Sequence, residues 1–170
     1  MDVPTLLALS LLSSTPTTPE ETYLVEQVSL CSKASQPGLT RQMLRMEEHL
    51  GVPATLRGMS LAAACKESRF NPSAKGDHGR AVGILQQWPW WEKKYRIHRV
   101  KAPEAAASWL IHVAAQVPKV QKQCGPLGEQ QMWIAAWVTA IRAPRKGGRC
   151  QQLPKHLGVL KAWQRAVRQT

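Results

Sequence analysis

One carboxyl group stands out in this chain because its surroundings suit acid catalysis. Glu67 falls in the last turn of a helix predicted over residues 55–68, and Leu56, Met59 and Ala63 recur upstream of it at helical spacing. The same spacing puts Glu67 on the apolar stripe that faces inward. A carboxyl group shielded from water stays protonated near neutral pH, as protonation of a glycosidic oxygen requires.

The competing interpretation of Glu67 is a carboxylate at a helix end, paired with Lys66 or Arg69. However, an acidic group in the last turn of a helix opposes the helix dipole, which costs about 0.3 kcal/mol or more. This unfavourable placement favours a functional role for Glu67.

The segment that follows Glu67 holds the other candidate residues. Asp77 lies in the glycine-flanked turn Gly76-Asp77-His78-Gly79, where the simpler interpretation is a turn-forming side chain. Indole rings close to a carboxyl group suit stacking on the apolar faces of sugars, although ordinary core packing accounts for at least one of them. The aromatic residues in this segment are Trp88, Trp90, Trp91 and Tyr95.

Metal and cofactor chemistry have no support in the sequence. His78, His98 and His112 lack ligand-like spacing, and the four cysteines form no CxxC pair. A glycine-rich phosphate loop and a GxSxG nucleophile elbow are also missing from the sequence. We therefore expect no metal and no cofactor.

The elements that must position these residues are predicted to be helical. Helical periodicity, Pro and Gly stops and possible caps define the segments, and no strand alternation or repeat is found. The fold class predicted is all-α, with one domain over residues 20–170. The predicted helices cover residues 20–32, 40–50, 55–68, 103–124, 127–143 and 153–168, with a short helix beginning near Val82 and ending at Pro89.

Residues 1–19 differ from the rest of the chain. Leu6 to Leu12 is a short apolar run, and it is followed by the sequence SSTPTTP. A signal peptide has such apolar and cleavage regions, but its start should be positive and here carries Asp2. The segment is therefore either a signal peptide or a disordered leader.

The cysteines leave the redox state open. Cys31, Cys65, Cys124 and Cys150 could form two disulfides in an exported protein, with three possible connectivities, or could be four buried thiols. Cys124 and Cys150 both lie in loop-like sequence, so they are the first choice for any bridge.

Charge indicates an anionic partner. Lys and Arg number 23 against 11 acidic residues, a formal net charge of +12 over 170 residues. Nucleic acid, an anionic membrane surface or an anionic cell-wall polymer would fit this charge. The basic residues are spread along the chain rather than concentrated in one arm, so we expect no nucleic-acid partner. No apolar run reaches the roughly 20 residues that span a bilayer, so no transmembrane segment is expected.

Three short motifs around Glu67 resemble those of the soluble lytic transglycosylase family, a goose-type lysozyme-like domain. They are Glu67-Ser68, then Phe70-Asn71-Pro72 with Ala74, and then Gly83-Ile84-Leu85-Gln86. The resemblance is specific over residues 56–91 and weaker over residues 20–168. It implies a single lysozyme-like helical domain with a catalytic cleft that cleaves the MurNAc–GlcNAc β-1,4 bond of peptidoglycan.

The same resemblance implies roles for individual residues. Glu67 would protonate the leaving oxygen, Ser68 would hold the substrate or the carboxylate, and Gln86 would line the saccharide groove beside the closely approaching Gly83. Trp88, Trp91 and Tyr95 are further candidate substrate contacts.

A further family motif, a helix ending Ala-Ala-Tyr-Asn-Ala-Gly, is only partly matched. The corresponding stretch is Ala135-Ala136-Trp137-Val138-Thr139-Ala140. Trp137 keeps an aromatic ring, Val138 replaces the Asn, and Thr139 is the candidate substitute for its substrate contact.

The reaction itself has two versions. With one Glu, the N-acetyl group of the substrate is the nucleophile, and the MurNAc 6-hydroxyl closes a 1,6-anhydro ring. The position of Asp77 is similar to that of an aspartate that positions water in goose-type lysozymes, which would permit hydrolysis instead. Transglycosylation is slightly favoured because Gln87 and Trp88 stand where those enzymes carry a further acid.

Other classes of protein remain as alternatives. They are a catalytically inactive, basic cell-wall-binding module on the same fold, and a basic helical binder of nucleic acid or membrane. For the enzyme we expect a monomer that is periplasmic, secreted or delivered to the periplasm by a phage.

Overall fold

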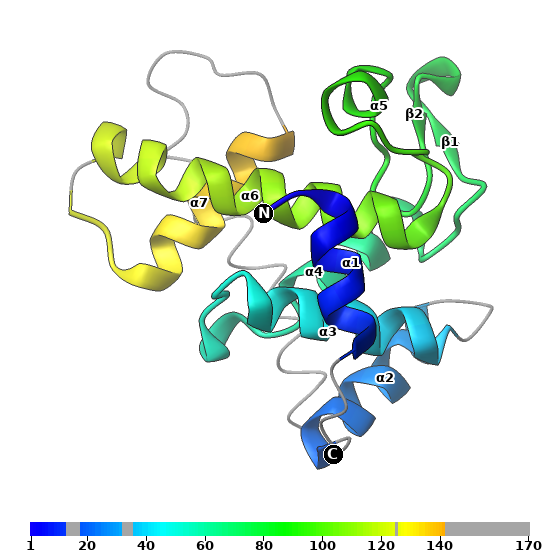
Figure 1. Ribbon diagram of the computed structural model, residues 1–170, viewed down its shortest axis with the longest axis horizontal. Helices are drawn as coiled ribbons and strands as arrows, with labels where there is room; N and C mark the ends of the chain where they lie inside the picture. Colours follow the sequence, from blue (N-terminus) through cyan, green and yellow to red (C-terminus); the bar gives the residue numbers. More distant parts are fainter. Residues whose placement is uncertain (13–17, 32–35, 125, 142–170) are drawn as a thin grey trace.

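The computed structural model describes residues 1–12, 18–31, 36–124 and 126–141 (Figure 1). Over these residues the chain is mostly helical with one small two-stranded sheet, consistent with the predicted all-α class. The predicted helix over residues 153–168 lies outside the described part. In chain order the elements are α1 (Val3–Leu12), α2 (Pro19–Cys31), α3 (Pro37–His49), η1 (Ala54–Leu56), α4 (Met59–Ser68), β1 (Lys75–Gly76), η2 (Asp77–Gly79), β2 (Ala81–Val82), α5 (Trp90–Tyr95), α6 (Ala102–Cys124) and α7 (Glu129–Ile141).

The first helix, α1, packs against α3 and α6. Val3 and Leu6 are buried in the common core, and the Asp2 carboxylate accepts a hydrogen bond of 2.8 Å from the backbone N–H of Thr5. Asp2 therefore caps the helix, which explains an acidic residue at this position. Over Val3–Leu12 the leader forms a helix that packs on α3 and α6, and its removal as a signal peptide stays a prediction.

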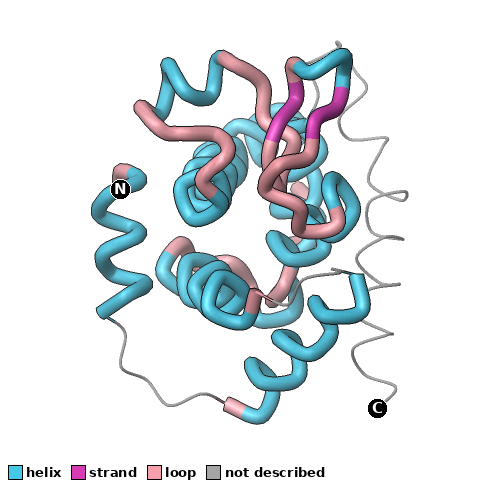
Figure 2. The backbone as a smooth tube through the Cα atoms, turned by 90° about the vertical axis from the view of Figure 1, so that its right-hand side faces the viewer, coloured by secondary structure: helices cyan, strands magenta, loops and turns pink. Residues whose placement is uncertain are grey.

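One hydrophobic core holds buried residues of α1, α2, α3, α4, α6 and α7. The long helix α6 packs against α7, α3 and α1, and α3 also packs against α2 and α4. In Figure 2, α1, which begins at the marked N-terminus, lies along one side of the other helices. Fully buried alanines at 62–64 of α4 and 105–107 of α6 leave room for close helix packing. Among the described helices, none is both long enough and apolar enough to cross a lipid bilayer.

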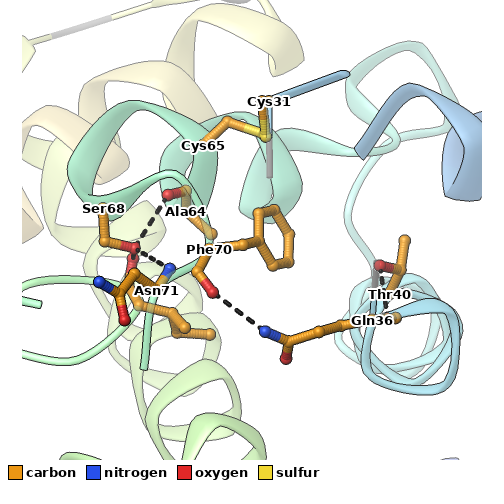
Figure 3. The surroundings of a disulfide bond; sticks show 9 residues. Cys31, Gln36, Thr40, Ala64, Cys65, Ser68, Phe70 and Asn71 are labelled. Carbon is orange, nitrogen blue, oxygen red and sulfur yellow. Dashed lines mark hydrogen bonds between the residues drawn. A yellow bond between two sulfur atoms is a disulfide. The ribbon is translucent and has the colours of Figure 1, made fainter. Parts of the chain in front are cut away.

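A disulfide joins Cys31, the last residue of α2, to Cys65 in α4, across 34 residues of sequence (Figure 3). Beside it, Gln36 Nε2 donates a hydrogen bond of 3.1 Å to the carbonyl oxygen of Phe70. Of the two alternatives left open for the cysteines, disulfides or buried thiols, this pair forms a disulfide. Cys124 is also disulfide-bonded, but its expected partner, Cys150, lies outside the described residues.

A short hairpin follows α4 and lies at the opposite end of the molecule from α2 (Figures 1 and 2). Its strands β1 and β2 are antiparallel, with Lys75 opposite Val82 and Gly76 opposite Ala81. The turn η2 joins them. The sequence predicted no strand here, because two-residue strands are too short to show alternation.

The predicted helix from Val82 to Pro89 is wrong. Residues 81–82 form β2, and helix α5 begins only at Trp90. Gly83 has φ +79° and Gln86 has φ +48°, and this left-handed region is incompatible with a right-handed helix. The backbone therefore turns twice between β2 and α5.

Candidate functional site

A pocket of about 240 Å³ lies between the end of α4, the hairpin, α5 and α6. Pockets for whole drug-sized ligands measure roughly 300–1,000 Å³, so this one accommodates part of an extended ligand, such as a single ring. Five residues predicted from the sequence line it, namely Glu67, Asp77, Gln86, Trp88 and Trp91. The other lining residues are Gly76, Ala81, Leu85, Trp90 and Trp109.

Glu67 is half-buried in the last turn of α4. Burial raises the pKa of its carboxyl group, nearby Lys66 opposes this effect, and the negative charge of Asp77 adds to the rise. Within the described part of the chain Glu67 forms no salt bridge. The alternative of a carboxylate paired with Lys66 or Arg69 is therefore wrong.

Helix α4 is held at its start by a buried carboxylate from α3. Glu47 accepts hydrogen bonds from the backbone N–H of Gly58 at 2.6 Å and of Ser60 at 2.7 Å, and its oxygen lies 2.5 Å from Ser60 Oγ. These N–H groups belong to the helix N-terminus, where a negative charge is favourable. Burial nevertheless raises the pKa of Glu47 to about 7.

The end of α4 is fixed by Ser68. Its hydroxyl donates a hydrogen bond of 2.8 Å to the carbonyl oxygen of Ile84, and its oxygen accepts one from the backbone N–H of Asn71 at 3.2 Å. The sequence predicted contact with substrate or carboxylate for Ser68. The structure places its hydrogen bonds within the backbone around the pocket, and Ser68 does not line the pocket.

Asp77 lines the pocket from the exposed turn η2, with φ +47°. Opposite it, Gln86 Nε2 donates to the carbonyl oxygens of Gly83 at 2.9 Å and Ala74 at 3.3 Å. The Gln86 amide oxygen occupies the space that a Cβ on Gly76 would need. Gln86 therefore both faces the pocket and fixes the hairpin that carries Asp77.

Gly83 does not line the pocket, contrary to the expected position beside a substrate. A Cβ at this position would collide with the carbonyl oxygen of Arg99. Arg99 also donates from Nη1 to the carbonyl oxygens of Arg80 at 2.8 Å and Gln87 at 3.0 Å. The group that closely approaches Gly83 is thus the Arg99 loop of the same chain.

The tryptophans of this region divide into exposed and buried rings. Trp88 and Trp90 are 39% and 44% exposed, whereas Trp91 is 4% exposed. Tyr95 stacks on Trp91, with ring centroids 5.3 Å apart, and its hydroxyl lies 2.7 Å from Nδ1 of His112. Tyr95 does not line the pocket, contrary to the predicted substrate contact; it packs against Trp91, which does.

In the stretch from Ala135 to Ala140, the three residues whose burial the structure describes, Ala135, Ala136 and Trp137, lie in the core. Trp137 is fully buried and packs edge-on against Trp109, with centroids 6.1 Å apart. It therefore supports a pocket residue from behind and does not reach the pocket. Thr139 belongs to α7, but its side chain is outside what the structure describes.

Sequence reasoning missed Trp109 as a pocket residue. Trp90 also lines the pocket; it was a candidate for sugar stacking in the aromatic segment but was not named as a substrate contact. Trp109 lies in the middle of a long apolar helix, where nothing local separates a pocket residue from a core residue. The histidine beside the aromatic cluster, His112, was also not expected; burial and the charges of Lys94 and Lys119 lower its pKa to about 4.

No group of metal-binding side chains occurs among the residues that the structure describes. A scan against protein-family models, a search of curated proteins and a search of solved structures each found no match to this chain.

Proposed function

We propose that this protein cleaves the MurNAc–GlcNAc β-1,4 bond of peptidoglycan, with Glu67 as the general acid. The observation that carries the proposal is the Glu67 carboxyl group, which is half-buried, lines a pocket and has a raised pKa. Such a group keeps its proton to a higher pH than an ordinary Glu does, and it can donate that proton to a leaving oxygen. Trp88, Trp91 and Trp109 supply apolar surface for a sugar ring in the same pocket.

The favoured reaction is transglycosylation. Glu67 donates its proton to the glycosidic oxygen as the bond from that oxygen to C1 of MurNAc breaks. The N-acetyl oxygen of the same sugar bonds to C1, and the Glu67 carboxylate then takes the proton of the 6-hydroxyl. The 6-oxygen bonds to C1 as the N-acetyl oxygen leaves, which gives the 1,6-anhydro product and restores the acid.

Hydrolysis is the second candidate because Asp77 lines the same pocket and acts on the pKa of Glu67. In this version Asp77 positions a water molecule that attacks C1. The carboxylate of Asp77 is exposed, which suits contact with water.

Clearing of purified peptidoglycan sacculi tests the assignment of the acid. Wild-type protein should lower the turbidity, and Glu67→Gln should not, while both give the same circular dichroism spectrum. Glu48→Gln is the matched control, since Glu48 is exposed on α3 and does not line the pocket. Equal clearing by wild type and Glu67→Gln would reject Glu67 as the acid.

Mass spectrometry of the released fragments separates the two reactions. Transglycosylation leaves 1,6-anhydro ends that are lighter by one water than the reducing ends left by hydrolysis. Asp77→Asn should reduce hydrolysis far more than transglycosylation. Binding to sacculi without any cleavage would indicate the inactive cell-wall-binding module instead.

The proposed partner and location follow from the substrate. Peptidoglycan lies outside the cytoplasmic membrane, so we propose a periplasmic, secreted or phage-delivered protein that acts as a monomer. The Cys31–Cys65 disulfide agrees with an oxidising compartment.

A further inference from the structure

Two cationic side chains lie over the exposed indoles at the pocket. The Arg80 guanidinium carbon is 5.8 Å from the ring centroid of Trp88, and Lys94 Nζ is 5.6 Å from that of Trp90. Both indoles line the pocket, whereas Arg80 and Lys94 do not. Both cations are exposed, so they stand beside the pocket and in contact with water.

Lys94 lies against a cluster of packed aromatic rings. Trp90 stacks on the buried Trp91 with centroids 4.5 Å apart, and both rings contact His112. Lys94 Nζ lies 3.2 Å from His112 Nδ1 and 5.1 Å from the centroid of Tyr95. An exposed indole and an ammonium group held in this way lose little conformational freedom when a ligand binds.

The charge changes sign between the pocket and its edge. The negative charge of Asp77 at the pocket repels a carboxylate, whereas Arg80 and Lys94 outside it attract one. In the part of the chain that the structure describes, neither Arg80 nor Lys94 forms a salt bridge. Their charges are therefore available to a ligand.

We propose that Arg80 and Lys94 form a subsite for the carboxylate groups of the peptides attached to the glycan, while the pocket takes an uncharged part of a sugar ring. This inference rests on the proposed function and names the part of the substrate that the protein recognises. Peptidoglycan carries two kinds of carboxylate, on the lactyl group of peptide-free MurNAc and on the peptide. The two cations lie beyond the indoles that line a ring-sized pocket, and this position favours the peptide.

Binding to the full-length Glu67→Gln protein tests the subsite independently of cleavage. Titration calorimetry would compare three ligands, namely peptide-bearing glycan fragments, the same fragments after amidase removal of the peptide, and neutral GlcNAc oligomers. Arg80→Ala and Lys94→Ala should each weaken binding of the peptide-bearing fragments by about fivefold, as expected for one exposed ion pair. Arg80→Lys should retain most of the affinity because it keeps the charge.

Lys122→Ala is the control for loss of one positive charge. Lys122 is exposed in the last turn of α6, about 20 Å along the helix from Trp109. The Lys122→Ala variant should bind all three ligands with the same affinity as the Glu67→Gln parent. Circular dichroism verifies that each variant is folded.

Equal losses for peptide-bearing and peptide-free fragments would overturn the peptide assignment and indicate the lactyl carboxylate. Unchanged binding in both alanine variants would overturn the subsite altogether. The same conclusion would follow if Arg80→Ala and Lys94→Ala weakened binding of a single-stranded oligonucleotide as much as binding of the peptide-bearing fragments. If wild type cleaves sacculi but neither alanine substitution changes binding, the proposed function stands and the subsite fails. If the cations matter for binding but wild type does not cleave, the subsite stands without the enzyme.

Discussion

The hydroxyl group of Ser68 donates a hydrogen bond of 2.8 Å to the carbonyl oxygen of Ile84. Ser68 directly follows Glu67, and Ile84 lies in the segment that carries the pocket residues Leu85 and Gln86. This bond therefore fixes the acid relative to the opposite wall of the pocket.

Ser68→Ala should lower the free energy of unfolding by about 1 kcal/mol, the typical contribution of one hydrogen bond. Clearing of sacculi should fall by more than this change in stability explains, because Glu67 would lose its fixed position. Thermal denaturation and turbidity measure the two effects, with Ser73→Ala, at an exposed loop position, as the control. Full activity in Ser68→Ala would show that the Ser68–Ile84 bond does not position the acid.

The pH dependence of cleavage should follow the charges around Glu67. The acid form is active, so the rate should fall as the pH rises through the raised pKa of Glu67. Asp77→Asn removes a charge that raises this pKa and should move the alkaline limb of the profile to lower pH. Lys66→Ala removes a charge that lowers it and should move the limb to higher pH.

Initial rates of clearing over a series of buffers measure both shifts. The shifts should shrink at high ionic strength, because Asp77 and Lys66 are exposed and their charges are screened. Shifts in the same direction for the two variants would contradict the assignment of the limb to Glu67.

Glu47 should make stability depend on pH. Its pKa is about 7 in the folded protein, against 4.5 for an ordinary Glu, so the unfolded chain loses this proton first as the pH rises. The contribution of Glu47 to the free energy of unfolding should therefore be largest below about pH 4.5. It should decrease by about 3 kcal/mol as the pH rises to about 7. Urea unfolding at pH 5 and pH 8 measures the difference.

Glu47→Gln removes this titration and serves as the comparison. It should be less stable than wild type at pH 5, since the amide replaces an acceptor that faces two backbone N–H groups. Its stability should change less between pH 5 and pH 8 than that of wild type. An identical pH dependence in both proteins would assign the effect to other groups.

Gly83 and Gly79 form a matched pair for alanine substitution. Their φ angles are +79° and +83°, but only Gly83 lacks space for a Cβ, since Gly79 has no neighbouring atom there. Gly79→Ala should cost about 1 kcal/mol for the left-handed backbone alone. Gly83→Ala should cost more, because the Arg99 loop must also move. Equal changes in the melting temperature would show that this loop yields easily.

Glu67 lines a pocket, but the apolar stripe from which the sequence predicted its inward position does not explain this. Leu56, Met59 and Ala63 are buried as expected, yet residues 59–64 of α4 are buried on every side. The apolar stripe therefore did not decide which way Glu67 points. Its exposure to a pocket depends on the hairpin and on α6, which lie far from it in sequence.

The features that sequence could not predict depend on contacts between distant segments. Gln86 has a positive φ while its amide bonds to Ala74, and Gly83 meets the Arg99 loop, so a local preference for helix after Val82 was overridden. The cap of α4 by Glu47 and the cluster of Lys94 with His112 arise in the same way. Contacts between such distant residues cannot be predicted from residue spacing.

The bridge between Cys31 and Cys65 ends two residues before Glu67, on the same helix. Reduction would release α4 from α2 and remove a cross-link of a size that typically contributes about 2–4 kcal/mol. We therefore expect the pocket to be robust outside the cytoplasm and weakened wherever thiols are kept reduced. On the proposed function, the reduced protein should clear sacculi more slowly than the same protein with this bridge formed.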